Sequence, residues 1–297
     1  MVNIYLKLMM TAFFWGGTFI AGRLLAGNVG AFSAAFLRFA IASIFLLTLV
    51  IKTEGKIPMP GKGLFIPIIL LGMTGVFSYN LFFFKGLQLI HAGRASLIIA
   101  NNPIFITLFS AIIFKDRLNY IQIIGILLSV TGAMVVITRG DLSMVAGGGL
   151  GWGEIYILCC VASWVAYSLI GKAVLTNLSP LNAVALAAAA GTLALLFPAL
   201  NEGLLGDLSS YSLGDWISLF YLGLFGTVIG FVWYYEGIRK IGTVKAGLFI
   251  NFVPISAVIL AFLILQEPLT FSLATGGLLV VSGVYLTNTS KLIFRRK

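Results

Sequence analysis

The sequence predicts an all-α integral membrane protein of ten transmembrane helices, arranged as two inverted-topology repeats of five helices. Three observations predict this fold: a strongly apolar composition, a long internal repeat, and basic residues that fall in alternate loops. Each repeat holds an odd number of spans, so its second copy must enter the bilayer from the other side.

The composition is that of a chain that lies in lipid. Of its 297 residues, 60% are hydrophobic and only 9% are charged, which is more apolar surface than a soluble domain of this length buries. A spanning helix needs about 20 mostly apolar residues. The predicted spans are residues 5–22, 31–51, 64–84, 93–113, 120–137, 151–170, 180–200, 214–234, 243–265 and 270–289.

Residues 75–137 recur without a gap as residues 226–288. The first span also matches the sixth, which argues that it belongs to the mature fold and is not a cleaved signal peptide. We therefore expect a first repeat at 1–140 and a second at 150–290 around one shared core, followed by a basic cytoplasmic tail at 291–297. The aligned pairs include Gly75/Gly226, Gly86/Gly237, Pro103/Pro254, Gly125/Gly276 and Gly132/Gly283.

The basic residues give the orientation. Most of the nineteen Lys and Arg residues fall in the termini and in every second loop; the exceptions are Arg23, Lys85, Arg94 and Arg139 in the other loops and Arg38 within a span. Cytoplasmic segments carry the excess of Lys and Arg, so both termini are predicted to be cytoplasmic. The net charge of +10 is thereby explained by membrane orientation, and no nucleic-acid partner is expected.

Two prolines mark the predicted midplane. Pro103 and Pro254 fall near the middle of the fourth and ninth spans, where each removes a backbone hydrogen bond and collides with the carbonyl four residues earlier. The carbonyls of Ile99 and Ile250 are therefore expected to be under-bonded. Transporters place substrate sites at such breaks.

Asparagines stand directly before both prolines. Asn101 and Asn102 precede the first kink and Asn251 precedes the second. An amide facing lipid is costly, so each side chain either bonds a carbonyl freed by the proline or faces a wet cavity. The two copies differ here, which predicts a symmetric scaffold around an asymmetric cavity.

Aromatic and polar residues on spans one, three, six and eight form a second candidate group. Tryptophan usually marks the membrane interface, but two of these tryptophans lie deep within their spans. With the kinked helices, the group is expected to wall a cavity for a small organic solute, simple packing being the alternative for each member. The residues are Trp15, Thr18, Phe19, Tyr79, Asn80, Trp164, Tyr167, Trp233 and Tyr234.

Arg38 is the one basic residue well inside a predicted span. A charge at this depth is costly and marks a functional-site candidate. It either has a structural role, with Glu154 as a candidate partner, or contacts an anionic substrate group such as a carboxylate.

Helix ends and small residues give further expectations. Asp116 and Glu267 are equivalent in the two repeats and are expected to complement the next helix N-termini, at Asn119 and Thr270; Asn119 with Gln122 forms a capping box. Small residues on spans five and ten predict close helix packing, with a dimer face as the alternative, so the chain is expected to be a monomer or a homodimer. These residues are Gly125, Ser129, Gly132, Gly276 and Gly283.

The sequence lacks the motifs of common catalytic centres. A Walker lysine motif, G-x-S-x-G and H-E-x-x-H are absent, and one loop histidine, His91, cannot assemble a usual metal or hydrolytic centre. We expect no cofactor, no metal and no enzymatic activity. A lipid-modifying intramembrane enzyme and a lipid scramblase or channel-like protein are the alternatives to a transporter.

Several of these motifs resemble the EamA domains of the drug/metabolite transporter superfamily. They are Phe14–Phe19 (FWGGTF), Leu37-Arg38-Phe39, and the paired Pro103/Pro254, Asp116/Glu267, Gly125/Gly276 and Gly132/Gly283. The resemblance covers nearly the whole chain as two tandem domains. It implies ten helices, cytoplasmic termini, and export of amino acids or related small metabolites by alternating access across a bacterial inner membrane.

The resemblance also bears on the site. Members that export aromatic amino acids line their cavity with spans one, three, four, six, eight and nine, which implies site roles for Trp15, Arg38, Asn101 and Asn102. Small multidrug members carry a glutamate in the first span, where this chain has Thr18 and Phe19. Antiport of cationic drugs is therefore not expected.

Overall fold

The computed structural model describes residues 2–56, 61–114, 118–141, 151–174 and 178–294, and within these ranges the chain forms helices and no strands. Ten of the helical stretches are long and apolar enough to cross a membrane. The predicted all-α membrane fold is confirmed. The third and eighth spans run further than expected, to Leu89 and Ile241, because helix continues past the apolar core into residues such as Lys85, Arg239 and Lys240 that reach the polar boundary.

The first repeat contains five spans, two of them interrupted. The third changes to π-helical geometry over the segment η1 and back again, and the fourth is broken in the middle. The elements are α1 (Val2–Leu25), α2 (Ala31–Glu54), α3 (Lys62–Leu71), η1 (Gly72–Ser78), α4 (Tyr79–Leu89), α5 (Ala92–Ile99), α6 (Asn102–Phe114) and α7 (Tyr120–Ile137).

The second repeat has the same pattern, including a π-helical segment in its third span and a break in its fourth. A short helix, α11, is added between its second and third spans. The elements are α9 (Trp152–Val174), α10 (Pro180–Asn201), α11 (Leu204–Asp207), α12 (Leu213–Gly223), η2 (Leu224–Ile229), α13 (Gly230–Ile241), α14 (Thr243–Ile250), α15 (Phe252–Leu265) and α16 (Phe271–Phe294).

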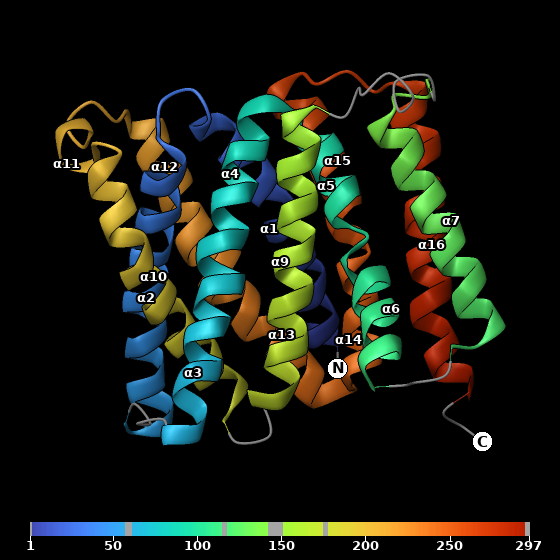
Figure 1. Cartoon of the computed structure of the whole chain (residues 1–297), viewed down its shortest axis with the longest axis horizontal. Coiled ribbons are helices and arrows are strands. Elements are labelled where there is room, and N and C mark those ends of the chain that lie inside the picture. Colours follow the sequence, from blue (N-terminus) through green and yellow to red (C-terminus); the bar gives the residue numbers. More distant parts are fainter. Residues whose placement is uncertain (1, 57–60, 115–117, 142–150, 175–177, 295–297) are drawn as a thin grey trace.

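The two repeats run in opposite directions. Helix α1 begins and α16 ends at the lower end of the bundle in Figure 1, which we call the terminal end. Helix α9, which starts the second repeat, begins at the upper end, called here the opposite end. Residues 295–297 of the predicted basic tail lie outside the described residues.

Helices of the two repeats pair with one another around one shared core. Helix α10 packs against α2, α15 against α1, α9 against α4, and α16 against α7. The last pair forms one edge of the bundle, and α2 with α10 lies near the other (Figure 1). The largest buried hydrophobic cluster accordingly contains residues of both repeats, among them Leu46, Phe83, Leu195 and Leu219.

The glycines of spans five and ten pack against each other within the chain. A Cβ atom added to Gly125 would lie 2.6 Å from the carbonyl oxygen of Gly283, and one added to Gly132 would lie 2.6 Å from that of Gly276. The small residues let the backbones of α7 and α16 approach closely. Within the chain, this face of α7 is therefore covered by α16.

Two of the predicted caps are described. Asn119 and Gln122 form the expected capping box at the start of α7. Glu267 does complement a helix N-terminus, but that of α5 and not that of α16, because it accepts hydrogen bonds from the backbone N–H groups of Ala92 (2.7 Å) and Gly93 (2.9 Å). Helix α16 has its own cap in the hydroxyl of Thr270. The equivalent Asp116 lies outside the described residues.

Candidate functional site

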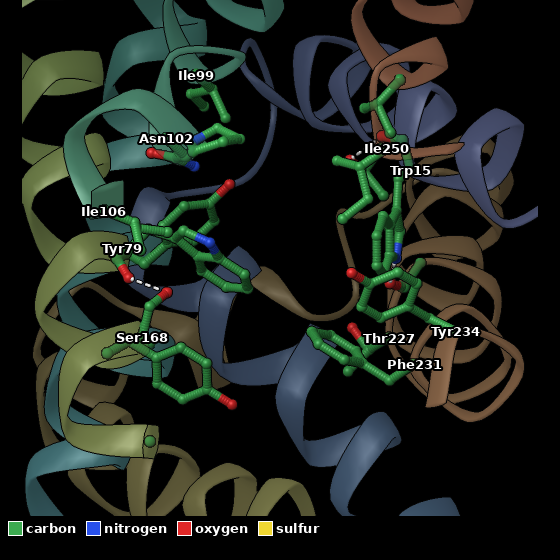
Figure 2. Close-up of a pocket in the computed structure, with 18 of the residues that line it drawn as sticks. Trp15, Tyr79, Ile99, Asn102, Ile106, Ser168, Thr227, Phe231, Tyr234 and Ile250 are labelled. Atoms are coloured by element: carbon green, nitrogen blue, oxygen red, sulfur yellow. Dashed lines mark hydrogen bonds between the residues drawn. The ribbon is translucent and has the colours of Figure 1, made fainter. Parts of the chain in front are cut away.

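A cavity of about 610 Å³ lies in the middle of the bundle. Figure 2 shows Tyr79 and Asn102 on one side of it and Trp15 and Tyr234 on the other. Its lining reaches Gly171, in the last turn of α9, so the cavity extends from the middle of the bundle towards the terminal end. Its volume suits a small organic molecule.

The cavity collects most of the residues that were predicted to form a site. They come from both repeats and from seven of the spans. These lining residues are Trp15, Thr18, Phe19, Arg38, Tyr79, Asn80, Asn102, Pro103, Trp164, Tyr167, Tyr234, Asn251 and Pro254.

Two predicted residues lie outside the cavity lining, and local geometry explains both. Asn101 points back along its own helix, where its amide nitrogen donates to the carbonyl oxygens of Leu97 (3.1 Å) and Ile98 (3.3 Å). Trp233 packs against Phe14 on α1 with ring centroids 5.8 Å apart. It precedes cavity-lining Tyr234 by one residue, and adjacent helical residues point about 100° apart.

Both proline-containing spans are broken where the sequence predicts. Helix α5 ends at Ile99 and α6 begins at Asn102; α14 ends at Ile250 and α15 begins at Phe252. The asparagines at the breaks differ in their partners. Asn101 is satisfied, whereas the buried Asn102 Oδ1 and both amide atoms of the buried Asn251 have no hydrogen-bond partner within the described part of the chain. Asn102 and Asn251 therefore bring free hydrogen-bonding capacity to the cavity wall.

The two π-helical segments also meet at the cavity. A π-turn leaves backbone carbonyls without their usual helical partners, and side chains take those places. The amide of Asn80 donates to the carbonyl oxygen of Val76 (2.8 Å) beside η1. The hydroxyl of Thr227 donates to the carbonyl oxygen of Leu222 (3.0 Å) beside η2. The indole N–H of Trp15 donates to the carbonyl of Gly226 at 3.0 Å.

Arg38 lies between these two segments. Its Nη1 donates to Oδ1 of Asn80 at 2.9 Å, while Nε and Nη2 both lie 3.4 Å from the hydroxyl oxygen of Thr227. The side chain is buried, with 7% of the residue exposed. A neutral amide and a neutral hydroxyl thus hold a guanidinium at the cavity wall.

Glu154, expected as a candidate partner of Arg38, pairs with Arg94 instead. The Nη1 atom of Arg94 lies 2.7 Å from Oε1 of Glu154, and both side chains are largely buried. The sequence placed Arg94 in a loop, but it lies in the first turn of α5, beside the start of α9. This proximity, which the sequence does not reveal, satisfies both charges.

Aromatic rings line the two sides of the cavity. On one side Trp164 lies 5.2 Å from Tyr79 and 5.1 Å from Tyr167, measured between ring centroids. On the other, Trp15 lies 5.3 Å from Tyr234. Trp15 and Trp164 are equivalent in the repeat, so each repeat provides one tryptophan with aromatic neighbours. The space between them suits an apolar or flat organic group.

Sequence reasoning missed several lining residues. Thr227, Phe231 and Tyr235 follow one another at four-residue intervals on α13 and η2 and face the cavity together, a spacing typical of one helix face. That signal was present in the sequence. Ser96, Thr107 and Ser168 also line the cavity, but isolated hydroxyl residues in a span carry no comparable signal.

Ten membrane-spanning helices in two inverted repeats, enclosing a central cavity, define a transporter of the two-repeat class. The chain belongs to the EamA-like transporter family, which matches residues 3–138 and 151–289.

Relatives along the whole length are also described as transporters. The chain is 29% identical to the uncharacterized transporter YyaM of Bacillus subtilis (strain 168), covering 95% of this chain and 92% of that protein. It is 28% identical to a probable terminal-alkyne amino-acid exporter of Streptantibioticus cattleyicolor, covering 98% and 95%. One solved crystal structure of a protein has the same fold, with a TM-score of 0.65 at 21% identity, covering 99% of this chain and 98% of the other.

Proposed function

We propose that this protein is a secondary transporter that exports amino acids or related small metabolites across the bacterial inner membrane by alternating access. The observation that carries the proposal is the central cavity, lined by both inverted repeats and extending from the middle of the bundle towards the terminal end. Inverted repeats permit a second conformation in which the cavity faces the other end. The similarity to a probable amino-acid exporter supports the substrate class.

The basic residues support an orientation with both termini in the cytoplasm. Helices α2 and α13 end at the terminal end (Figure 1) with Lys52 and Lys240 in their last turns, and cytoplasmic segments carry the excess of Lys and Arg. In this orientation the cavity extends towards the cytoplasm, as the loading state of an exporter requires.

Counterflow tests the proposal. Purified protein is reconstituted into proteoliposomes loaded with an unlabelled amino acid, and entry of the same labelled amino acid is followed over time. Saturable accumulation that depends on the internal amino acid is expected, because a carrier exchanges its substrate across the membrane. Uptake that never saturates would indicate a channel-like protein, and phospholipid turnover or scrambling without counterflow would overturn the proposal.

A further inference from the structure

Arg38 is a buried cation that has no anionic partner among the residues that the structure describes. The described part of the chain offers it one amide oxygen and one hydroxyl as hydrogen-bond acceptors, the hydroxyl at 3.4 Å from two of its nitrogens, and the ring of Phe39 at 5.2 Å. A buried charge is normally paired, and Arg94 in this same protein is paired with Glu154 at 2.7 Å. The chain thus pairs the arginine at the start of α5 with a carboxylate and leaves Arg38, at the cavity, open to an anionic ligand.

The cavity has a positive charge balance. Arg38 is the one ionised side chain among the described residues that line it, and the lining contains no Asp or Glu. Because Arg38 is largely removed from water, it attracts an anion more strongly than an exposed cation does. A ligand ammonium, by contrast, would find no carboxylate there and would be repelled by the guanidinium.

The rest of the wall fits an uncharged body. Trp15 lies on one side of the cavity (Figure 2), and Trp164 packs against Tyr79 on the other, so an apolar group between them would meet aromatic rings. Asn102 and Asn251 offer unpartnered amide atoms that form hydrogen bonds without needing charge. An arginine fork matches the two oxygens of a carboxylate. A doubly charged phosphate would leave one negative charge unbalanced beside a single cation.

We propose that the cavity selects small organic monoanions with an apolar or aromatic body, that Arg38 binds the carboxylate of this substrate, and that an ammonium group is not required. The proposal rests on the proposed transport function for its biological meaning, but it concerns recognition at the cavity. Carboxylic acids that lack the amino group are therefore substrates at least as good as the matching amino acids.

Binding tests this inference separately from transport. Purified protein in detergent is heated with one of five matched compounds: 3-phenylpropanoate, its primary amide, L-phenylalanine, 2-phenylethylamine or phenyl phosphate. A second series carries an isobutyl group in place of the aromatic group. The carboxylates are expected to raise the midpoint of unfolding, and the amines are not. Equal stabilisation by amine and carboxylate, a preference for the phosphate, or no stabilisation by any carboxylate would overturn the inference.

Variants assign the role to Arg38. In Arg38→Gln, the affinity for carboxylates should fall by about thirtyfold or more, because a desolvated charge pair is lost, while the affinity for the uncharged amides changes little. Arg38→Lys keeps the charge without the fork and should retain part of the preference. The matched control, Arg94→Gln, breaks the other buried arginine's ion pair and should lower the unfolding temperature while leaving the preference for carboxylates intact.

The outcomes separate the two proposals. Carboxylate-selective binding without counterflow would contradict the proposed transport function but support the proposed binding site. Counterflow that is indifferent to ligand charge, or an Arg38→Gln variant that loses amides and carboxylates alike, would sink the recognition site and leave the transporter.

Discussion

At the residue scale, Asn101 and Asn251, which lie at the breaks of the fourth and ninth spans, differ in their hydrogen-bond partners and therefore in their roles. Asn101 donates to Leu97 and Ile98 and accepts a hydrogen bond of 2.7 Å from the hydroxyl of Ser129, so it holds the break together. Asn251 has no partner for either amide atom among the described residues. One amide stabilises the fold, and the other is available to a ligand.

Leucine substitutions separate these roles. Asn101→Leu should lower the free energy of unfolding by about 1 to 3 kcal/mol, because two buried carbonyl groups and one hydroxyl group lose their hydrogen-bond partner. Asn251→Leu should not lower it, since no hydrogen bond is lost, but should weaken ligand binding. Thermal unfolding with and without 3-phenylpropanoate measures both effects. Equal destabilisation by the two substitutions would contradict the assignment.

At the element scale, the sequence predicts the proline breaks but not the π-helical segments. A mid-span proline removes a hydrogen bond wherever it stands, so Pro103 and Pro254 carry a local signal. The π-turns depend on tertiary partners: Asn80 and Thr227 occupy the freed carbonyls. The repeated glycines Gly75 and Gly226 mark the places without revealing the geometry. For the same reason, the sequence finds Arg38 but not its two partners.

The packing of helix α7 against helix α16 can be tested by a substitution at their contact. In Gly132→Ala, the new Cβ would lie 2.6 Å from the Gly276 carbonyl oxygen and 2.7 Å from Leu279 Cβ, so the helices must move apart. We expect a loss of about 1 to 3 kcal/mol, measured by thermal unfolding in detergent. Thr131→Ala, one residue away on the exposed face, is the control and should change little. If Gly132→Ala altered the oligomeric state but not the stability, this contact would not hold the pair together.

At the scale of the whole molecule, the orientation of the bundle is testable with single cysteines. Lys56 follows α2 at the terminal end, and Asn201 ends α10 at the opposite end; both are exposed. In a background without Cys159 and Cys160, an impermeant thiol reagent should label Lys56→Cys only from the cytoplasmic side and Asn201→Cys only from the outside. Labelling of both from one side would refute the inverted arrangement.

Carboxylates join the repeats at the ends of the bundle in two different ways. Helices α2 and α10 are held at both ends: Glu202 accepts hydrogen bonds from Ser33 at the opposite end, and Glu54 accepts them from Ser179 and Asn182 at the terminal end. This pair is fixed along its length. The contact of Glu267 with the start of α5 joins the fourth and ninth spans at the opposite end, away from the end towards which the cavity extends.

To expose the cavity at the opposite end, α5 must separate from the end of α15. Because Glu267→Ala removes the hydrogen bonds between them, it should favour the conformation in which the cavity is exposed at that end. Loss of a helix cap is worth about 0.5 to 2 kcal/mol, which shifts a two-state population by about two- to thirtyfold. Ser96 lines the cavity from α5 and is buried. Labelling of Ser96→Cys from the opposite end should therefore speed up by that factor in Glu267→Ala. The control is Glu202→Ala, which removes a helix cap at the same end from α2 and α10, a helix pair that Glu54 also holds. It should leave the labelling rate of Ser96→Cys unchanged. Equal rates in the two variants would show that Glu267 does not hold the cavity closed.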